Sequence, residues 1–186
     1  ERTGAGMMEC KKALVETNGD LDAAAELMRK QGLAKADKKA ARVAAEGVIA
    51  LEKSADGHSA AIVEINCETD FVAKNDNFRD FVKDITLHIA AAHPLYVTRA
   101  QVPEALITKE REIAAAQVVG KPANIVDKIV DGKIDKFYST ICLLEQSFIK
   151  NPDVTIDDLV KTKIAELGEN IIIRRFTRYG VGEELA

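Results

Sequence analysis

The chain has 186 residues, of which 47% are hydrophobic and 30% charged, a balance typical of a folded protein and not of a disordered one. A net charge of −4 and only 5% aromatic residues, none of them Trp, argue against a nucleic-acid-binding protein, which needs basic patches and stacking platforms. No apolar run approaches the ~20 residues that cross a bilayer, and no signal-peptide pattern opens the chain, so neither a membrane nor a secreted protein is expected.

Residues 1 to 34 predict a small helical N-terminal module. Apolar side chains recur at helical spacing over Met7 to Val15, and a second helix is predicted over Leu21 to Lys30, with Gly32 closing it. The chain starts at Glu1 inside what reads as a preceding helix. We therefore expect the first helix of this module to be truncated.

Residues 35 to 46 predict a basic linker between the module and the rest of the chain. The alanine- and lysine-rich tract from Lys35 to Arg42 could contact RNA or an acidic partner. Because Ala and Lys are good helix formers and the tract is short, we favour a solvated helical linker.

Residues 47 to 186 predict a core that opens with a β-hairpin. Two apolar runs, Gly47 to Glu52 and Ser59 to Asn66, flank the turn signal Asp56-Gly57. Alternation in the second run places four residues on one face of the sheet: Ala61, Val63, Ile65 and Cys67.

The run CETDFVAKN, which follows the second strand, predicts a short capped helix. Thr69 and Asp70 are N-cap residue types, so Phe71 and Val72 would lie in the first turn. The polar residues that follow offer little to bury this aromatic, which makes Phe71 a candidate anchor for a partner's surface. The spacing alone favours the plainer interpretation that Phe71 packs onto its own core.

The remaining elements are mostly helices. Apolar periodicity and stop signals predict helices over Phe78 to Ala92, Glu104 to Val118, 123 to 141 and Asp157 to Leu167, with a stop at Gly120-Lys121-Pro122 and a closing strand over Ile171 to Tyr179. The predicted fold class is α+β, in which an N-terminal helical module precedes a small antiparallel sheet covered by helices.

The sequence contains no recognisable catalytic constellation. The three cysteines, Cys10, Cys67 and Cys142, are an odd number without CxxC spacing, which indicates reduced thiols in a cytosolic compartment. The histidines lack metal-ligand spacing, and the chain has no phosphate-binding loop, HExxH or GxSxG motif. We expect no enzymatic activity, no metal and no cofactor.

Four motifs, in order along the whole chain, carry a resemblance to a known family. They are RTGAGMMECKKAL at 2–14, ETDFVAKN at 68–75, LEQSFI at 144–149 and LGENIIIRRF at 167–176. Together they resemble the signatures of bacterial-type translation elongation factor Ts. The resemblance implies a guanine-nucleotide exchange factor for elongation factor Tu and a ubiquitin-associated-like fold for the N-terminal module. It also implies the bacterial cytoplasm, or an organellar matrix or stroma.

The resemblance also implies residue roles. Within the run Thr69 to Val72, Asp70 and Phe71 match residues that press as a wedge between helices of the partner's nucleotide domain, near its Mg²⁺. Met7 and Met8 match residues through which the module docks on a neighbouring helix of that domain, a use that suits adaptable thioether side chains. Another set matches positions that touch the partner's far domain: His58, Ile149, Lys150 and Leu167. Lys150 departs from the family pattern, in which an apolar residue is common there.

Two further expectations concern partners. Many family members have two copies of the core subdomain, whereas this chain has one and resembles the short form. A pairing of cores is then possible only between chains, so we expect a homodimer whose two subunits meet through an apolar stripe in 78–92 or 123–141. This dimer would bind two copies of elongation factor Tu. The alternative function is a non-exchange adaptor or RNA-binding chaperone that works through the Lys35 to Arg42 tract.

Overall fold

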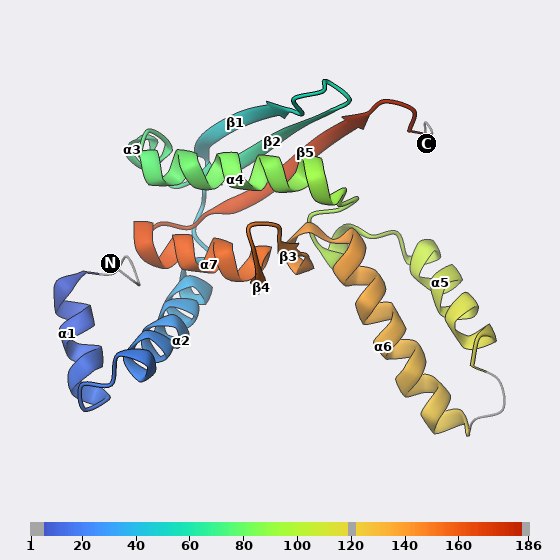
Figure 1. Cartoon of the computed structure of the whole chain (residues 1–186), viewed down its shortest axis with the longest axis horizontal. Coiled ribbons are helices and arrows are strands. Elements are labelled where there is room, and N and C mark those ends of the chain that lie inside the picture. The colour runs from blue at the N-terminus through green and yellow to red at the C-terminus, as the bar shows by residue number, and fades with distance from the viewer. Residues whose placement is uncertain (1–5, 119–121, 184–186) are drawn as a thin grey trace.

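The computed structural model describes residues 6–118 and 122–183 and has an α+β fold (Figure 1). A three-stranded antiparallel sheet lies over α4 and α7, while α1 with α2, and α5 with α6, extend away on opposite sides. The helices are α1 (Met7–Glu16), α2 (Leu21–Lys39), α3 (Asp70–Ala73), α4 (Asp76–Ala92), α5 (Glu104–Ala116), α6 (Ala123–Ile141) and α7 (Ile156–Leu167). The strands are β1 (Glu46–Lys53), β2 (Ser59–Cys67), β3 (Ser147–Phe148), β4 (Asn151–Thr155) and β5 (Ile172–Gly180).

The predicted fold class is confirmed by these elements. The sheet has the order β1–β2–β5, so the hairpin predicted from Asp56-Gly57 is completed by the predicted closing strand. The expected truncated first helix falls on residues 1–5, and most of the helix stop predicted at Gly120-Lys121-Pro122 falls on residues 119–121. Both lie outside the described residues.

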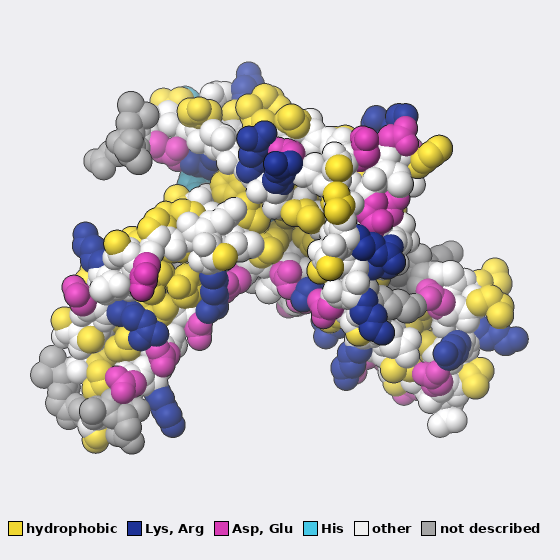
Figure 2. Space-filling view, turned by 180° about the vertical axis from the view of Figure 1, so that it is seen from behind, with side chains coloured by type: hydrophobic (Ala, Val, Ile, Leu, Met, Phe, Trp, Pro, Cys, Tyr) yellow, Lys and Arg dark blue, Asp and Glu magenta, His cyan; other side chains and the backbone are white. Residues whose placement is uncertain are grey.

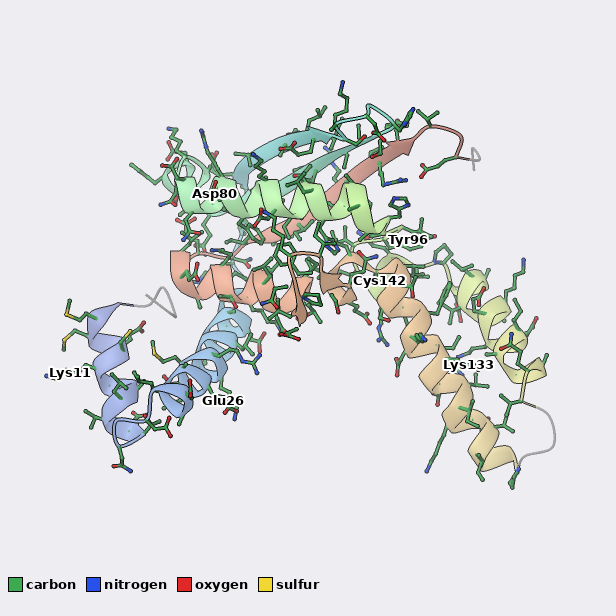
Figure 3. All side chains as sticks on the ribbon, viewed as in Figure 1. Lys11, Glu26, Asp80, Tyr96, Lys133 and Cys142 are labelled. Carbon is green, nitrogen blue, oxygen red and sulfur yellow. The ribbon has the colours of Figure 1, made fainter. Side chains whose placement is uncertain are left out.

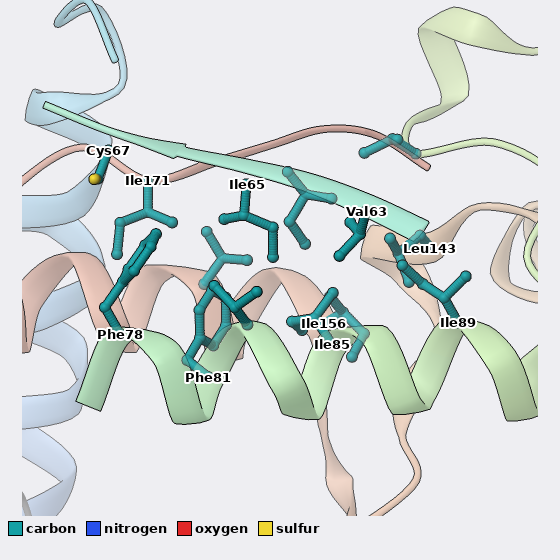
Figure 4. Close-up of a cluster of buried hydrophobic side chains, with 14 of the residues drawn as sticks. Val63, Ile65, Cys67, Phe78, Phe81, Ile85, Ile89, Leu143, Ile156 and Ile171 are labelled. Atoms are coloured by element: carbon teal, nitrogen blue, oxygen red, sulfur yellow. The ribbon is translucent and has the colours of Figure 1, made fainter. Parts of the chain in front are cut away.

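One face of the sheet is buried and forms the main core (Figure 4). Along β2, the four alternate residues that the sequence placed on one face are all fully buried: Ala61, Val63, Ile65 and Cys67. They meet a helical stripe of α4 formed by Phe78, Phe81, Val82, Ile85 and Ile89, and α7 adds Ile156, Val160 and Ile164. Burying a large apolar side chain contributes about 1.5–3 kcal/mol, so this layer is the main source of stability.

The apolar stripes that we expected to face a second subunit are used inside the chain. The stripe of α4 is buried in the main core, where Phe78, Ile85 and Ile89 have no exposed surface. In α6, Val130 and Ile134 are buried against Ala114 of α5. The buried side chains of these two stripes are therefore unavailable to a second subunit.

Helix α2 corrects the predicted helix end and the predicted linker. It runs without a break from Leu21 to Lys39, through Gly32. A Cβ atom at Gly32 would lie 3.3 Å from Cβ of Ala165 on α7, so the glycine permits a close helix–helix approach and does not end the helix. Ala36 is 1% exposed within the main core, and Asp37 pairs with Lys161 at 3.4 Å. The start of the predicted linker is thus helical, as expected, but it packs on α7 through one face while Asp37 and Lys38 stay exposed.

Helices α5 and α6 form an antiparallel arm with its own small core. Where the arm leaves the main body, Tyr96 and Cys142 lie side by side as an isolated β-bridge (Figure 3). Beside them, Arg99 pairs with Glu145 and Asp135 and lies over the ring of Tyr138. Among the described residues, none of the helices combines the length and the apolar character needed to cross a bilayer.

The hairpin of β3 and β4 was not predicted. β3 has two residues and β4 five, and the register shifts between Ser147 and Phe148. Strands this short carry too few residues for a period of two to be visible. The hairpin leads directly into α7, whose N-cap Thr155 accepts a hydrogen bond from the N–H of Asp158 at 3.1 Å.

Candidate partner-binding site

Helix α3 presents an exposed aromatic side chain at the end of β2. Thr69 is the N-cap, and its hydroxyl oxygen accepts a hydrogen bond from the N–H of Val72 at 3.4 Å, as the sequence predicted. Asp70 is the first helical residue. Phe71 is 82% exposed, so the interpretation that it packs onto its own core is wrong. Val72, one residue on, turns inward and packs against the main core.

The carboxylate of Glu169 holds the segment that carries Phe71. One carboxylate oxygen accepts hydrogen bonds from the N–H groups of Glu68 and Thr69, both at 3.0 Å, and the other accepts from the Thr69 hydroxyl at 2.5 Å. Hydrogen bonds to a charged acceptor are about twice as strong as neutral ones. The position of Thr69, and with it the direction of α3, is therefore set by a residue 100 positions away in the sequence.

A second set of hydrogen bonds joins the same two segments with the donor and acceptor sides exchanged. The N–H of Asn170 donates to a carboxylate oxygen of Glu68 at 2.6 Å. The Asn170 side chain, in a residue 2% exposed, donates to the carbonyl oxygens of Ala40 and Arg42. Arg42 lies 3.6 Å from the Glu68 carboxylate. Glu68, Glu169 and Asn170 belong to the motifs at 68–75 and 167–176, but the sequence alone predicts no role for them.

Local sequence explains why Glu169 can reach Thr69. Gly168 ends α7 in the left-handed region, at φ 79°, where glycine carries no Cβ penalty. The chain turns there, and β5 then pairs antiparallel with β2. A helix-ending glycine followed by two polar residues and an apolar strand is the one local signal that could have drawn attention to this turn.

Asp70 faces solvent and forms an ion pair with Lys74, the C-cap residue of α3. Its carboxylate lies 2.7 Å from Nζ of Lys74, and this hydrogen bond, with the charge of Lys74, lowers the pKa of Asp70. Asp70 is therefore a negative charge beside the exposed ring of Phe71. That pair can present a charged group and an apolar group together to one partner surface.

Met7 and Met8 lie on a different part of the molecule. They are 88% and 78% exposed on α1, which packs on α2. A shallow open hollow runs along this helix, lined by Met7, Cys10, Lys11, Leu14, Val15, Asn18 and Gly19. Much of α1 is therefore an uncovered apolar surface, with Lys11 at its edge.

The other predicted contact residues are scattered over the core. His58 lies in the β1–β2 turn, where one carboxylate oxygen of Asp56 accepts a hydrogen bond from the His58 backbone N–H and the other contacts its ring Nδ1. Ile149 and Lys150 form the β3–β4 turn, and Lys150 pairs with Asp84 of α4 at 2.6 Å. Leu167, at the end of α7, packs partly against the main core and precedes the turn that carries Glu169.

These residues form separate patches and no single pocket. His58 and Thr69 flank opposite ends of the nine-residue strand β2, which at about 3.3 Å per residue separates them by roughly 30 Å. Within the described residues, no group of three or more His, Cys, Asp or Glu side chains is placed to hold a metal ion. The geometry fits several contacts on one large protein partner better than a small-molecule site.

Comparison with known proteins identifies the family of this chain. The family model described as elongation factor TS matches residues 79–183. The elongation factor Ts of Carboxydothermus hydrogenoformans is 57% identical over an alignment covering 100% of this chain and 87% of that protein. The chain belongs to the elongation factor Ts family. The proteins of the same name from Acetivibrio thermocellus and Geobacter sulfurreducens are 58% and 55% identical, each over 98% of this chain and 86% of the relative.

Membership of the family makes this chain a translation elongation factor and confirms the resemblance drawn from its four motifs. The family model begins at residue 79, beyond α3, so it does not cover the run from Thr69 to Val72. The alignments with the full-length relatives do cover this run, because they span nearly the whole chain.

Proposed function

We propose that this chain is a guanine-nucleotide exchange factor for elongation factor Tu and acts by inserting the wedge, residues Thr69 to Val72, beside the partner's nucleotide site. The single observation that supports this most is Phe71, 82% exposed on a four-residue helix whose direction is fixed by Glu169. A protruding aromatic held by a fixed backbone loses little conformational freedom when it binds. Such residues are the usual energetic centres of protein interfaces.

The activity follows from linked equilibria. The wedge fits a partner whose Mg²⁺ site and phosphate loop are displaced, so it binds the nucleotide-free state better than the GDP-bound state. By reciprocity, the bound exchange factor weakens the partner's affinity for GDP by the same factor. Asp70 and Phe71 act at the metal and the adjoining helices. This is a binding equilibrium, so it needs neither a catalytic group nor a cofactor in this chain.

The remaining contacts supply affinity in this proposal. Residues 1–34, a ubiquitin-associated-like module, dock through Met7 and Met8, joined by residues 35–46 to the core at 47–186. The contacts to the far domain of elongation factor Tu come from His58, Ile149, Lys150 and Leu167. The three relatives named above are bacterial, and we place this activity in the bacterial cytoplasm.

The direct test mixes the chain with purified elongation factor Tu loaded with fluorescent GDP. We expect the release of GDP to accelerate with the concentration of the chain and then saturate. Release that stays at its spontaneous rate at every concentration would refute the proposal. Omitting Mg²⁺ provides the reference for release without the metal.

The alternative, an adaptor or RNA-binding chaperone, depends on the tract from Lys35 to Arg42. Part of that tract is occupied within the fold, because Ala36 is buried and Asp37 pairs with Lys161. A pull-down from lysate separates the two functions. Recovery of a GTPase that GDP then releases favours exchange, and recovery of nucleic acid with a steep salt dependence favours the alternative.

We also propose that the chain acts as a homodimer, through the face of the sheet that α4 does not cover. In Figure 2 the sheet is at the top of the view, where several hydrophobic side chains lie together on the surface. The open face carries Ile49, Leu51, Ile62, Ile172 and Tyr179, which are 40–70% exposed. Two such faces related by a two-fold axis can pack as a sandwich, and an isologous dimer is the commonest closed assembly.

A further inference from the structure

Three segments that are distant in the sequence meet directly behind the wedge. We call this the junction and define it as Arg42, Glu68, Glu169 and Asn170. It contains the chain just after α2, the end of β2 and the turn between α7 and β5. Its bonds join each segment to the other two: Glu68 to Asn170, Asn170 to the carbonyl oxygens of Ala40 and Arg42, and Arg42 back to Glu68.

The wedge depends on this junction for its direction. Helix α3 has four residues, far below the length at which a helix is stable by itself. Phe71 itself is mostly exposed, so its own packing does little to hold the segment. Val72 and Ala73 pack into the main core on the inner side of α3. At its start, the Glu169 carboxylate accepts three hydrogen bonds, from the N–H groups of Glu68 and Thr69 and from the Thr69 hydroxyl, and so fixes the segment that leads into the wedge. Without that carboxylate, two N–H groups and one hydroxyl lose their common acceptor.

The N-terminal helices depend on the same junction. The chain leaving α2 is held where Asn170 donates to Arg42 O at 2.7 Å and to Ala40 O at 3.3 Å. Upstream, α2 lies on α7, with Ala36 in the main core and Gly32 against Ala165. Neighbouring residues of a single turn, Glu169 and Asn170, therefore hold the wedge and the base of the N-terminal helices respectively.

We propose that Glu169 and Asn170 are positioning residues for nucleotide exchange: Glu169 aims the wedge, and Asn170 sets the N-terminal helices in register with it, so that both contact one partner molecule at the same time. This inference rests on the proposed function. It goes further in assigning a role to two residues that do not themselves touch the partner, and in making the two contact sites one coupled unit.

The first test separates aiming from affinity. We expect Glu169→Ala to lower the rate of GDP release at saturating concentration about tenfold, with a much smaller change in the half-saturating concentration, because the other contacts remain. Glu169→Gln keeps one acceptor oxygen, so its rate of GDP release at saturating concentration should fall only about threefold. The matched control is Glu166→Gln, since Glu166 lies in the last turn of α7, three residues before Glu169, and bonds to Lys163 and Asn77 instead of the wedge. A control rate equal to that of the parent is expected.

The outcomes of this test are distinct from failure of the proposed function. If the unaltered chain does not accelerate release, the proposed function fails. If it does and Glu169→Ala matches it, the positioning role is overturned. Should Glu169→Ala be unfolded at the assay temperature, Glu169→Gln decides in the same way: a reduced saturating rate supports the role, and a rate equal to that of the parent overturns it.

The second test measures the coupling by a double-mutant cycle. Met7→Ala with Met8→Ala should raise the half-saturating concentration in the parent, and do so clearly less in Asn170→Ala, whose N-terminal helices are already out of register. Asn170→Ser, whose shorter side chain keeps a polar group but lacks the amide that donates to the carbonyl oxygens of Ala40 and Arg42, is the second variant in case Asn170→Ala is unstable. If the methionine substitutions raise the half-saturating concentration by the same factor in the parent and in Asn170→Ala, the two sites are independent and the coupling is overturned.

Discussion

His88 of α4 accepts, through Nδ1, a hydrogen bond from the backbone N–H of Ile149 at 3.3 Å. A backbone N–H can only donate, so Nδ1 is unprotonated, and Nε2–H donates to the Gln146 side chain at 2.9 Å. His88 has no exposed surface. The β3–β4 turn, with Lys150 at its tip, is thus held by a neutral imidazole.

This relationship predicts how stability depends on pH. Burial lowers the pKa of His88 below its usual value near 6.5, so the unfolded chain binds this proton more readily than the folded one. The free energy of unfolding therefore keeps its full value above the usual pKa near 6.5 and falls as the pH drops from there through the lowered pKa of the folded state. The loss is at most about 1.4 kcal/mol per pH unit. Urea unfolding at pH 7.5 and 5.5 measures it. His88→Gln should show a smaller loss between the two values, and an equal loss would contradict the assignment.

Phe71→Ala should impair exchange while leaving the fold intact. Loss of an aromatic anchor costs at least ~2 kcal/mol of binding, or roughly thirtyfold in the half-saturating concentration or the rate. Because Phe71 is 82% exposed, the melting temperature should change little. Phe78→Ala is the opposite control: Phe78 is fully buried, so its truncation should cost about 3–5 kcal/mol of folding stability. Exchange by Phe71→Ala at the rate of the parent would remove the wedge from the mechanism.

The sequence predicts those parts of this fold that depend on neighbouring residues. Alternation in β2 and the stripe of α4 were readable because each repeats several times along one element. Thr69 was recognisable as a cap because its bond to the N–H of Val72 spans three residues. Each of these signals is complete within one element.

Features decided by distant residues were not readable. Gly32 resembles a helix end, yet Ala165 on another helix makes it a packing glycine. The spacing alone favours burial of Phe71, because the short helix that the run predicts does not show which of its sides faces the core. The role of Glu169 is visible only once the turn after α7 meets the end of β2. Motif resemblance corrected the second of these, but not the first or the third.

Met7→Ala with Met8→Ala should weaken binding without changing the action of the wedge. Both side chains are on α1, which does not belong to the junction, and they contribute contact area alone. We expect a higher half-saturating concentration and recovery of the parent's GDP-release rate at high concentration. Leu95→Ala, another exposed apolar residue, is the control and should match the parent. A defect that persists at saturation would show that α1 takes part in the displacement of nucleotide.

The open face of the sheet predicts the oligomeric state. Ile49 and Leu51 project from β1 on that face and are 70% and 62% exposed. If it joins two copies, light scattering of the parent should give twice the 20.3 kDa of one chain. Ile49→Glu with Leu51→Glu places four buried carboxylates at a two-fold interface, which costs several kcal/mol and should yield monomers. Ile113→Glu on the arm is the matched control, since it adds a charge at an exposed isoleucine outside the face. A parent that stays at the mass of one chain across micromolar concentrations would exclude the dimer, and a parent that dimerises equally well with both glutamates would exclude this face.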